Sequence, residues 1–387
     1  MKKAITNGRI TERGFSNPRL TADNNVRAPM SARSEGRHAR RPLQGPTIGD
    51  LKWVGLIGRV EPMSNLLLTV VFLSMLFSSA LAQEKSKFPL SASSKTLGYS
   101  PLWVASKLGF FEKQSLDVQL VLVSGADKST MALVGGSVNV STGGTDTVIA
   151  AVEQGADLAS IGGVINGLTH YIMGGKKFKS FEDLRGANIG SSGLTSGTAF
   201  VLRRVLRAKG MEYPRDYSLI NVGGSAQAFL SLTAGRIDAA IIAVPLNYEA
   251  AQMGFPVIAK VVDFIPNYQL TEVTVKRSWA DKNRALTVRF MKGLIQAMRW
   301  MYDNKEPAIE FLAKEMQLKP DAARRGWEYY TENKIWNPNA ESNVEGVRTV
   351  IQIAAERGQF KSGALPAPAK YLDHSFVEEA LKELGKR

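Results

Sequence analysis

Short apolar segments alternate with helical segments along most of the chain, and this alternation constrains the fold more than any other feature. Strands are predicted at 95–100, 117–123, 138–142, 158–165 and 171–173. The helices between them are predicted at 101–108, 128–134 and 146–154. Strands separated by helices of this length form βαβ units with a largely parallel sheet. The first half of the alternation therefore predicts an α/β unit.

The alternation then restarts and builds a second unit. Strands are predicted at 187–191, 218–222, 238–244 and 256–262, with helices at 198–208, 226–234 and 245–253. Asp238–Val244 (DAAIIAV) is almost continuously apolar, as expected for a strand with helices on both faces. The remainder is predicted to be helical, over 284–304, 306–316, 320–333, 343–357 and 376–384. In the first of these helices, apolar side chains at helical spacing are interpreted as core: Phe290, Met291, Leu294, Ile295, Met298 and Met301.

Positive charge is concentrated at the start of the chain. The formal net charge is +14, and residues 1–62 carry 12 of the 49 Lys and Arg but only 5 of the 35 Asp and Glu. This segment has no sustained apolar period, so it cannot bury enough surface to fold alone. It is interpreted as a disordered leader or a mis-assigned start, with an RNA-binding arm as the alternative.

The next segment, 63–82, has the pattern of a signal peptide. Leu66–Phe77 (LLLTVVFLSMLF) is apolar but shorter than the roughly 20 residues that span a bilayer. It is followed by Ser78-Ser79-Ala80-Leu81-Ala82, with small residues at the positions that precede a cleavage site. We expect export, with cleavage after Ala82, and hence a periplasmic protein. The sequence has no cysteine, which excludes a lipid-anchoring cysteine and disulfide bonds.

Motifs for catalysis are missing from the sequence. It contains no G-x-x-x-x-G-K-[ST] phosphate loop, no G-x-S-x-G elbow and no H-E-x-x-H zinc motif. Three histidines, His38, His170 and His374, are too few for a histidine-rich metal cluster. We therefore expect no catalytic residues, no metal and no cofactor. His170 follows a strand and is a candidate for a cleft, although a structural histidine is the simpler interpretation.

Hydroxyl groups and glycines gather at the carboxyl ends of predicted strands, where ligands bind in open α/β sheets. The richest case is Ser191-Ser192-Gly193-Leu194-Thr195-Ser196-Gly197-Thr198, between a strand and a helix. Hydroxyls and free N–H groups at a helix N-terminus can hold an anion or a polar head group. Ordinary N-capping is the alternative. The candidate ligand-binding residues of this loop are Ser191, Ser192, Thr195 and Ser196.

Three further strand ends supply candidates. Thr142 and Gly143 come from Ser141-Thr142-Gly143-Gly144-Thr145-Asp146, in which Asp146 is assigned to the N-terminus of its own helix. Tyr99, Ser100 and Trp103 begin the first helix, where Trp103 either covers a ligand or packs in the core. Val244, followed by Pro245, Asn247 and Tyr248, ends the apolar strand. Together these segments suggest a cleft between two lobes that closes around a small ligand.

Several segments, in this order and spacing, resemble one known family. They are Leu97–Val121 (LGYSPLWVASKLGFFEKQSLDVQLV), Gly135–Asp146 (GGSVNVSTGGTD), Phe181–Gly197 (FEDLRGANIGSSGLTSG), Leu232–Pro245 (LTAGRIDAAIIAVP) and Tyr371–Leu381 (YLDHSFVEEAL). They resemble periplasmic substrate-binding proteins of nitrate/sulfonate/taurine-type ABC importers (SsuA/THI5-like, NMT1-like). This group includes proteins that bind thiamine-pyrimidine precursors. The resemblance covers about residues 95–385.

The resemblance implies a type II periplasmic-binding fold with two α/β lobes, two crossover segments and C-terminal helices. Lobe 1 is expected at 83–175 and 265–387, lobe 2 at 176–264, and the crossovers near 174–178 and 262–268. The family's cleft positions fall on Ser100, Thr142, Gly143, Ser192, Thr195, Ser196 and Val244. The implied function is capture of a small organic or anionic solute and its delivery to an ABC permease by a monomer that binds no nucleic acid. The alternative is an enzyme of the thiamine-pyrimidine-synthase type. The strand-end loops contain no arginine to pair with an anion, and Arg203 and Arg204 are expected to face solvent.

Overall fold

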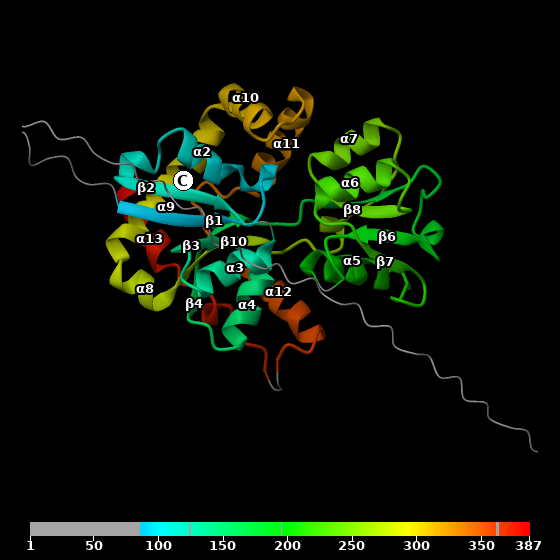
Figure 1. The fold of residues 1–387 in the computed structure, drawn as a ribbon, viewed down its shortest axis with the longest axis horizontal. Coiled ribbons are helices and arrows are strands. Elements are labelled where there is room, and N and C mark those ends of the chain that lie inside the picture. Colours follow the sequence, from blue (N-terminus) through cyan, green and yellow to red (C-terminus); the bar gives the residue numbers. More distant parts are fainter. Residues whose placement is uncertain (1–85, 124, 195, 361–363) are drawn as a thin grey trace, which may run out of the picture. The chain divides into compact units, whose positions relative to one another are not determined.

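The computed structural model describes residues 86–387, except for 124, 195 and 361–363. The expected leader and signal peptide therefore lie outside the described residues. No helix in the described part of the chain is long and apolar enough to cross a membrane. The described residues form two five-stranded sheets with helices around them (Figure 1).

The first sheet consists of β1 (Ser86–Ala92), β2 (Leu116–Leu122), β3 (Val140–Thr142), β4 (Leu158–Ile165) and β10 (Thr271–Lys276). Its strand order is β2-β1-β3-β10-β4. β1 runs parallel to β2 and β3, with Leu90 in register with Leu120 and Val140. β10 runs antiparallel to both of its neighbours.

The second sheet consists of β5 (His170–Gly174), β6 (Asn188–Ser191), β7 (Ser218–Asn221), β8 (Ala239–Ala243) and β9 (Val257–Lys260). Its order, β7-β6-β8-β5-β9, repeats the pattern of the first sheet. β6 pairs in parallel with β7 and β8, and β5 is antiparallel to β8 and β9. In each sheet the fourth strand in the order is the antiparallel one, and it reaches the sheet from the other lobe.

Helices follow the strands of both sheets and make up most of the C-terminal third. Those between the strands are α2 (Ser100–Lys107), α3 (Ala126–Val134), α4 (Thr145–Glu153), α5 (Gly197–Arg207), α6 (Ser225–Thr233) and α7 (Leu246–Gln252). After β10 come α8 (Arg277–Lys282), α9 (Arg284–Asp303), α10 (Lys305–Glu315), α11 (Pro320–Glu332), α12 (Val344–Glu356) and α13 (Ser375–Leu384). The two α/β sheets and the C-terminal helices were expected from the sequence, although the chain after 265 is not entirely helical.

Two chain segments connect the sheets. Residues 166–169 lead from β4 to β5, and residues 261–270 lead from β9 to β10. The sequence places the first crossover near 174–178 and the lobe boundary after residue 175. The strand His170–Gly174 instead pairs with β8 and β9 of the second sheet, so the first crossover comes before this strand. The expected segment 262–268 falls inside the observed second crossover.

Two strands of the first sheet differ from the sequence prediction. Residues 95–100 are not a strand: Leu97–Tyr99 forms a 3₁₀ turn that leads into α2. The strand in this part of the chain is Ser86–Ala92, where Pro89 weakens the sequence signal because proline has no N–H for a sheet. Thr271–Lys276 (TEVTVK) was expected to lie in a helical region, but it forms β10. This short strand is buried between β3 and β4.

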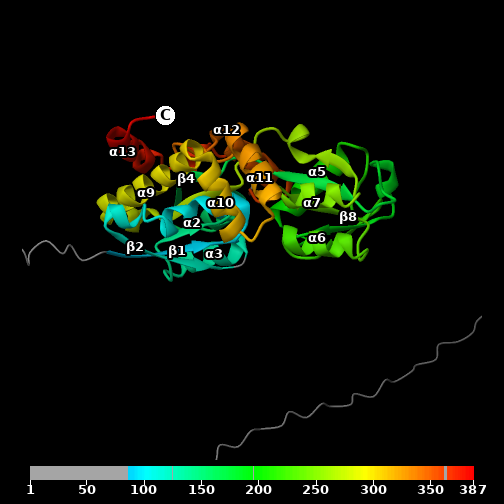
Figure 2. The same ribbon diagram turned by 90° about the horizontal axis from the view of Figure 1, so that it is seen from above.

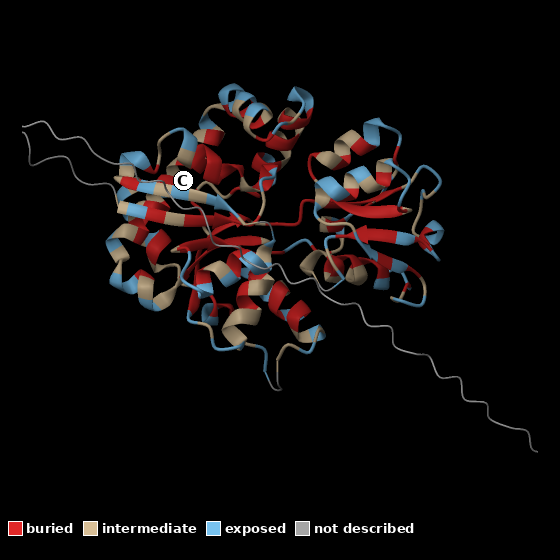
Figure 3. Cartoon of the chain, viewed as in Figure 1, coloured by how far each residue is buried: buried red, intermediate tan, exposed pale blue. Residues whose placement is uncertain are grey.

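The long helix α9 is a main component of the core. All six apolar residues predicted to face inward are buried: Phe290, Met291, Leu294, Ile295, Met298 and Met301. The Phe290 ring stacks on Phe88 of β1, with centroids 4.9 Å apart, and on Phe111, with centroids 5.0 Å apart. These contacts fix α9 against the first sheet. Figure 2 shows α9 among the elements of the first lobe, and Figure 3 shows the strands at the centre of both sheets as buried.

The helices α11 and α12 lie between the two sets of elements in both ribbon views (Figures 1 and 2). Arg325 of α11 stacks on Tyr248 of α7, with its guanidinium carbon 4.1 Å from the ring centroid. On α12, Glu356 accepts a hydrogen bond from Arg204 of α5 at 2.8 Å. The C-terminal helices thus contact the second lobe from two sides. Arg204 is therefore paired with α12, whereas the sequence predicts that it faces solvent.

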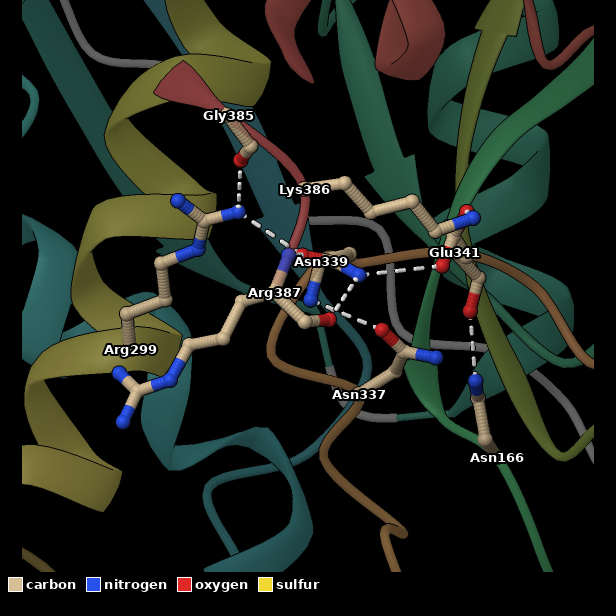
Figure 4. Close-up of polar contacts among 8 residues, drawn as sticks. All are labelled: Asn166, Arg299, Asn337, Asn339, Glu341, Gly385, Lys386 and Arg387. Carbon is tan, nitrogen blue, oxygen red and sulfur yellow. Dashed lines mark hydrogen bonds and ion pairs between the residues drawn. The ribbon is translucent and has the colours of Figure 1, made fainter.

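The end of the chain is held by a polar cluster around Asn339 (Figure 4). The Asn339 side chain accepts from the Arg387 backbone N–H at 3.0 Å and donates to the Arg387 carbonyl at 2.7 Å. Arg299 of α9 donates to Asn339 Oδ1 at 2.8 Å. Nearby, Asn166 of the first crossover donates to the Glu341 carbonyl at 2.6 Å. The 337–341 loop therefore joins the C-terminal residues to a crossover segment.

One buried carboxyl group lies within the first sheet. Glu272 of β10 is fully buried, and neither of its carboxyl oxygens forms a hydrogen bond with a described residue. Burial raises its pKa from 4.5 to about 7. The ionised form of Glu272 is therefore disfavoured in the folded protein.

Candidate functional site

A cavity of about 880 Å³ is lined by residues from both lobes. The first lobe contributes the segment after β1, the start of α4 and the start of β10, and the second lobe contributes the starts of α5 and α6 and the end of β8. The C-terminal helices contribute Tyr330 and Arg357. The lining therefore combines strand ends with helix N-termini, the parts of an α/β fold that commonly hold small ligands.

The N-terminus of α5 forms one wall of the cavity. Ser196 is the N-cap residue, and its hydroxyl accepts a hydrogen bond from the Ala199 N–H at 3.3 Å. Ser192 donates to Ser196 Oγ at 3.0 Å, and its hydroxyl lies 2.5 Å from that of Thr198. This hydroxyl network surrounds a helix end whose first N–H groups have no partner within the helix.

The N-terminus of α6 forms a second part of the same wall. Gly223, Gly224 and Ser225 line the cavity. The Ser225 hydroxyl accepts from the Ala243 N–H at 3.1 Å, so this helix start is fixed to the end of β8. The loop before α6 therefore has a defined position.

Tyrosines also line the cavity. The Tyr99 hydroxyl lies 3.3 Å from Thr271 Oγ1, and the Tyr330 hydroxyl donates to Thr169 Oγ1 at 3.4 Å. Behind Tyr330 the Trp336 ring is fully buried, with ring centroids 4.5 Å apart. Burial raises the pKa of both tyrosines, which keeps their hydroxyls neutral and able to donate.

Charged side chains meet where α5 faces the first lobe. Asp146 lies in the first turn of α4, and its Oδ2 is 3.9 Å from Nη1 of Arg357. The Arg357 guanidinium carbon is 4.0 Å from the centroid of the Phe200 ring on α5. Burial raises the pKa of Asp146, and Arg357 counteracts this effect. The cavity thus contains a carboxylate and a guanidinium that partly neutralise one another.

His170 begins β5 and is buried in the cavity wall, with 8% of the residue exposed. Its Nδ1 has no hydrogen-bond partner among the described residues. Burial lowers its pKa from 6.5 to about 4, so the imidazole is neutral near pH 7. A neutral imidazole offers a ligand one acceptor nitrogen or one N–H donor.

The structure separates the residues that were predicted to bind ligand into three groups. Five line the cavity: Tyr99, His170, Ser192, Ser196 and Val244. Five are buried outside its lining: Ser100, Trp103, Thr142, Gly143 and Ser191. Thr195 lies outside the described residues.

The five residues outside the lining have structural surroundings. The Thr142 hydroxyl donates to the Ser91 carbonyl at 3.0 Å, and the Ser191 hydroxyl donates to the Gly193 carbonyl at 2.9 Å. Of the two interpretations given for Trp103, packing in the core is the one that the structure shows, because Trp103 belongs to the hydrophobic core. A Cβ on Gly143 would lie 2.6 Å from Thr130 Oγ1, so glycine permits a close approach there. Ser100 is fully buried in the first turn of α2.

Sequence reasoning missed other residues of the cavity. Asp146 was assigned to its own helix, and Arg357, Tyr268, Thr271 and Tyr330 were not considered. Arg357 also supplies the arginine that the strand-end loops lack. Tyr268 comes from the second crossover, Thr271 from the start of β10, and Tyr330 and Arg357 from the C-terminal helices, so their approach to the cavity depends on tertiary packing. The only sequence signal was the position of Asp146 beside the Gly143-Gly144 loop.

Hydroxyls, aromatic rings, one neutral imidazole and an ion pair make this cavity suitable for holding a small polar solute. Within the described part of the chain, no cluster of three or more His, Asp or Glu side chains is placed to hold a metal ion.

Comparisons with known proteins agree with this architecture. The formylaminopyrimidine-binding protein of Halalkalibacterium halodurans is 22% identical over 266 residues, covering 64% of this chain and 77% of that protein. The periplasmic aliphatic sulphonate-binding protein SsuA of Escherichia coli matches with a TM-score of 0.58 and 18% identity, over 76% of this chain and 92% of SsuA. The periplasmic nitrate-binding protein NrtA of Synechocystis PCC 6803 matches with a TM-score of 0.64 and 16% identity, over 78% of this chain and 89% of NrtA.

The structural matches confirm the type II periplasmic-binding fold that the sequence predicts. The family model described as NMT1/THI5 like matches residues 97–308, more than half of the chain. The chain belongs to the NMT1/THI5-like family.

Proposed function

We propose that this protein is the solute-binding component of an ABC importer, which captures a small solute between its lobes and delivers it to a membrane permease. The observation that carries the proposal is the cavity of about 880 Å³, to which both lobes contribute strand ends and helix N-termini. A volume of this size suits a small organic molecule. Three of the similar proteins are named as binding proteins for formylaminopyrimidine, aliphatic sulphonates and nitrate, and these names support a solute-binding function.

Closure of the lobes is part of the proposal. Both crossovers connect the two sheets, so a rotation about them would open and close the cavity. Closure excludes water and strengthens each polar contact with the solute. Export after cleavage behind Ala82, a periplasmic location and a monomeric state complete the proposal. The mass of the exported chain and its size in solution test these points.

A thermal-shift screen tests the binding function directly. The panel contains nitrate, aliphatic and aromatic sulfonates, carboxylates, formylaminopyrimidine and other pyrimidines. A solute at 100 times its Kd should stabilise the folded protein by about 2.7 kcal/mol. Calorimetric titration of each hit then gives the stoichiometry, for which we expect one solute per chain. Failure of every solute to stabilise the protein at millimolar concentration would contradict the proposal.

Position-specific variants show whether a hit occupies this cavity. Tyr330→Phe removes a hydroxyl from the cavity wall and should weaken binding, because that hydroxyl is buried beside Thr169. Tyr302→Phe is a matched control, since the Tyr302 hydroxyl donates to the Trp336 carbonyl outside the cavity. Mass spectrometry of the solute after incubation tests the enzyme alternative. Turnover that disappears in His170→Gln would favour that alternative.

A further inference from the structure

Asp146 lies against the helix end where an anionic solute would be expected. A Cβ on Gly197, the first residue of α5, would be only 2.7 Å from Asp146 Oδ2. The carboxylate comes from the first lobe and the helix from the second. The unbonded N–H groups of a helix N-terminus attract negative charge, and here a carboxylate of the protein is already beside them.

The groups around Asp146 offset part of its negative charge, but the carboxylate remains available to a solute. Arg357 is 3.9 Å away and is held over the Phe200 ring, so its charge offsets that of Asp146. His170 is more than nine-tenths buried, lines the same cavity, and has an Nδ1 without a partner among the described residues. This imidazole is a further polar group available to a solute. The cavity therefore offers a carboxylate acceptor, guanidinium donors and an imidazole.

We infer that Asp146 determines the specificity of the cavity: it selects a solute that presents an uncharged or cationic N–H group and disfavours a small anion. The inference rests on the proposed function and deepens it. A solute carboxylate or sulfonate at the α5 N-terminus would have to lie beside the Asp146 carboxylate, and like charges brought together in a partly buried site repel strongly. An amide or amino group at the same place donates to Asp146 while its neighbouring acceptor faces Arg357.

Pairs of compounds that differ only in this group provide the test. Nicotinamide and nicotinate share one ring, as do benzenesulfonamide and benzenesulfonate, and methanesulfonate and sulfate serve as small anions. Binding to the full chain is measured by calorimetric titration at pH 7.5. For the wild type we expect the uncharged member of each pair that binds to have a Kd at least about tenfold lower than the anionic member.

The variant Asp146→Asn removes the negative charge and keeps the shape of the side chain. We expect it to bind the anions at least about tenfold more tightly than the wild type does. Asp117→Asn is the matched control, because Asp117 is an exposed residue of the edge strand β2 and its loss changes net charge equally. Asp117→Asn should leave the ratio of the two Kd values, for the uncharged and the anionic compound of a pair, the same as in the wild type. Asp146→Ala is a second variant that lacks the charge, and its unfolding transition should be the same as that of the wild type. If it also binds the anions more tightly, the effect comes from the lost charge and not from the asparagine side chain.

The outcomes separate this inference from the proposed function. If Asp146→Asn and Asp146→Ala bind the anions no more tightly than the wild type does, the inference is overturned. The same holds if neither variant nor the wild type binds any of the anions. It is also overturned if the wild type binds an anion more tightly than the matching amide, although the solute-binding function would then stand. If no solute from the wider screen binds and no import depends on the protein, the proposed function itself fails.

Discussion

The buried carboxyl of Glu272 should make stability depend on pH. Its pKa is 4.5 when exposed and about 7 in the folded protein, because burial disfavours its ionised form. Each pKa unit corresponds to about 1.36 kcal/mol, so the full effect is about 3 kcal/mol. Between these two pKa values the folded state holds the proton more tightly than the unfolded state. The group therefore costs nothing at low pH, and its cost grows as the pH rises through 7.

The substitution Glu272→Gln isolates this contribution, since glutamine has nearly the same shape and never ionises. The free energy of unfolding is measured with urea and tryptophan fluorescence at pH 5 and pH 8. We expect the stability of the variant relative to the wild type to increase by about 2.5 kcal/mol between these two pH values. Glu310→Gln on the exposed face of α10 is the control and should show no such change. A difference between Glu272→Gln and wild type that stays constant with pH would refute the reasoning.

Three further predictions concern the cavity and the contact between the lobes. His170 has a folded pKa of about 4, lowered by burial from 6.5, so its own contribution to stability should fall by about 3 kcal/mol as the pH falls from 7 to 4. In urea unfolding, the stability of His170→Gln relative to the wild type should therefore rise by about this amount over the same range, because Glu272 acts equally in both proteins. Ser196→Ala removes the α5 N-cap and should cost about 1 kcal/mol of stability in the same assay, and an unchanged urea midpoint would contradict this role. Arg204→Glu should weaken the affinity for any solute that closes the lobes, because Arg204 pairs with Glu356 of α12. In calorimetric titrations, the double variant Arg204→Glu/Glu356→Arg should regain the affinity for this solute that Arg204→Glu loses. If the double variant binds as weakly as Arg204→Glu, the ion pair does not act in closure.

Most of the fold follows from sequence patterns that extend over several residues. Buried strands such as Ala239–Ala243 are apolar runs in the sequence, and α9 shows a helical repeat of large apolar side chains. The two strands that were missed are those whose local signal is weak. Ser86–Ala92 contains a proline, and Thr271–Lys276 is short and mostly polar. Their place in the sheet depends on neighbours at least 30 residues away in the chain.

The candidate site was predictable only where it is local. Ser192 and Ser196 lie in one strand-to-helix loop, so their position in the cavity lining follows from the order of elements. Arg357 and Tyr330 reach the cavity because α11 and α12 pack between the lobes, and no local pattern contains that information. Thr142 and Ser191 show the converse, since a hydroxyl at a strand end can bond to the adjacent backbone and remain outside the cavity.

The equal strand orders of the two sheets also predict which parts of the molecule move as rigid bodies. β5 and β10 follow the two crossovers directly, and each has a bonded strand on both sides. Amide hydrogens in such doubly paired strands exchange slowly, because exchange requires a large part of the lobe to open. Exchange protection should therefore rise sharply from 166–169 into β5 and from 261–270 into β10. The steps in exchange rate would show where each crossover ends and the paired strand begins, even before a solute has been identified.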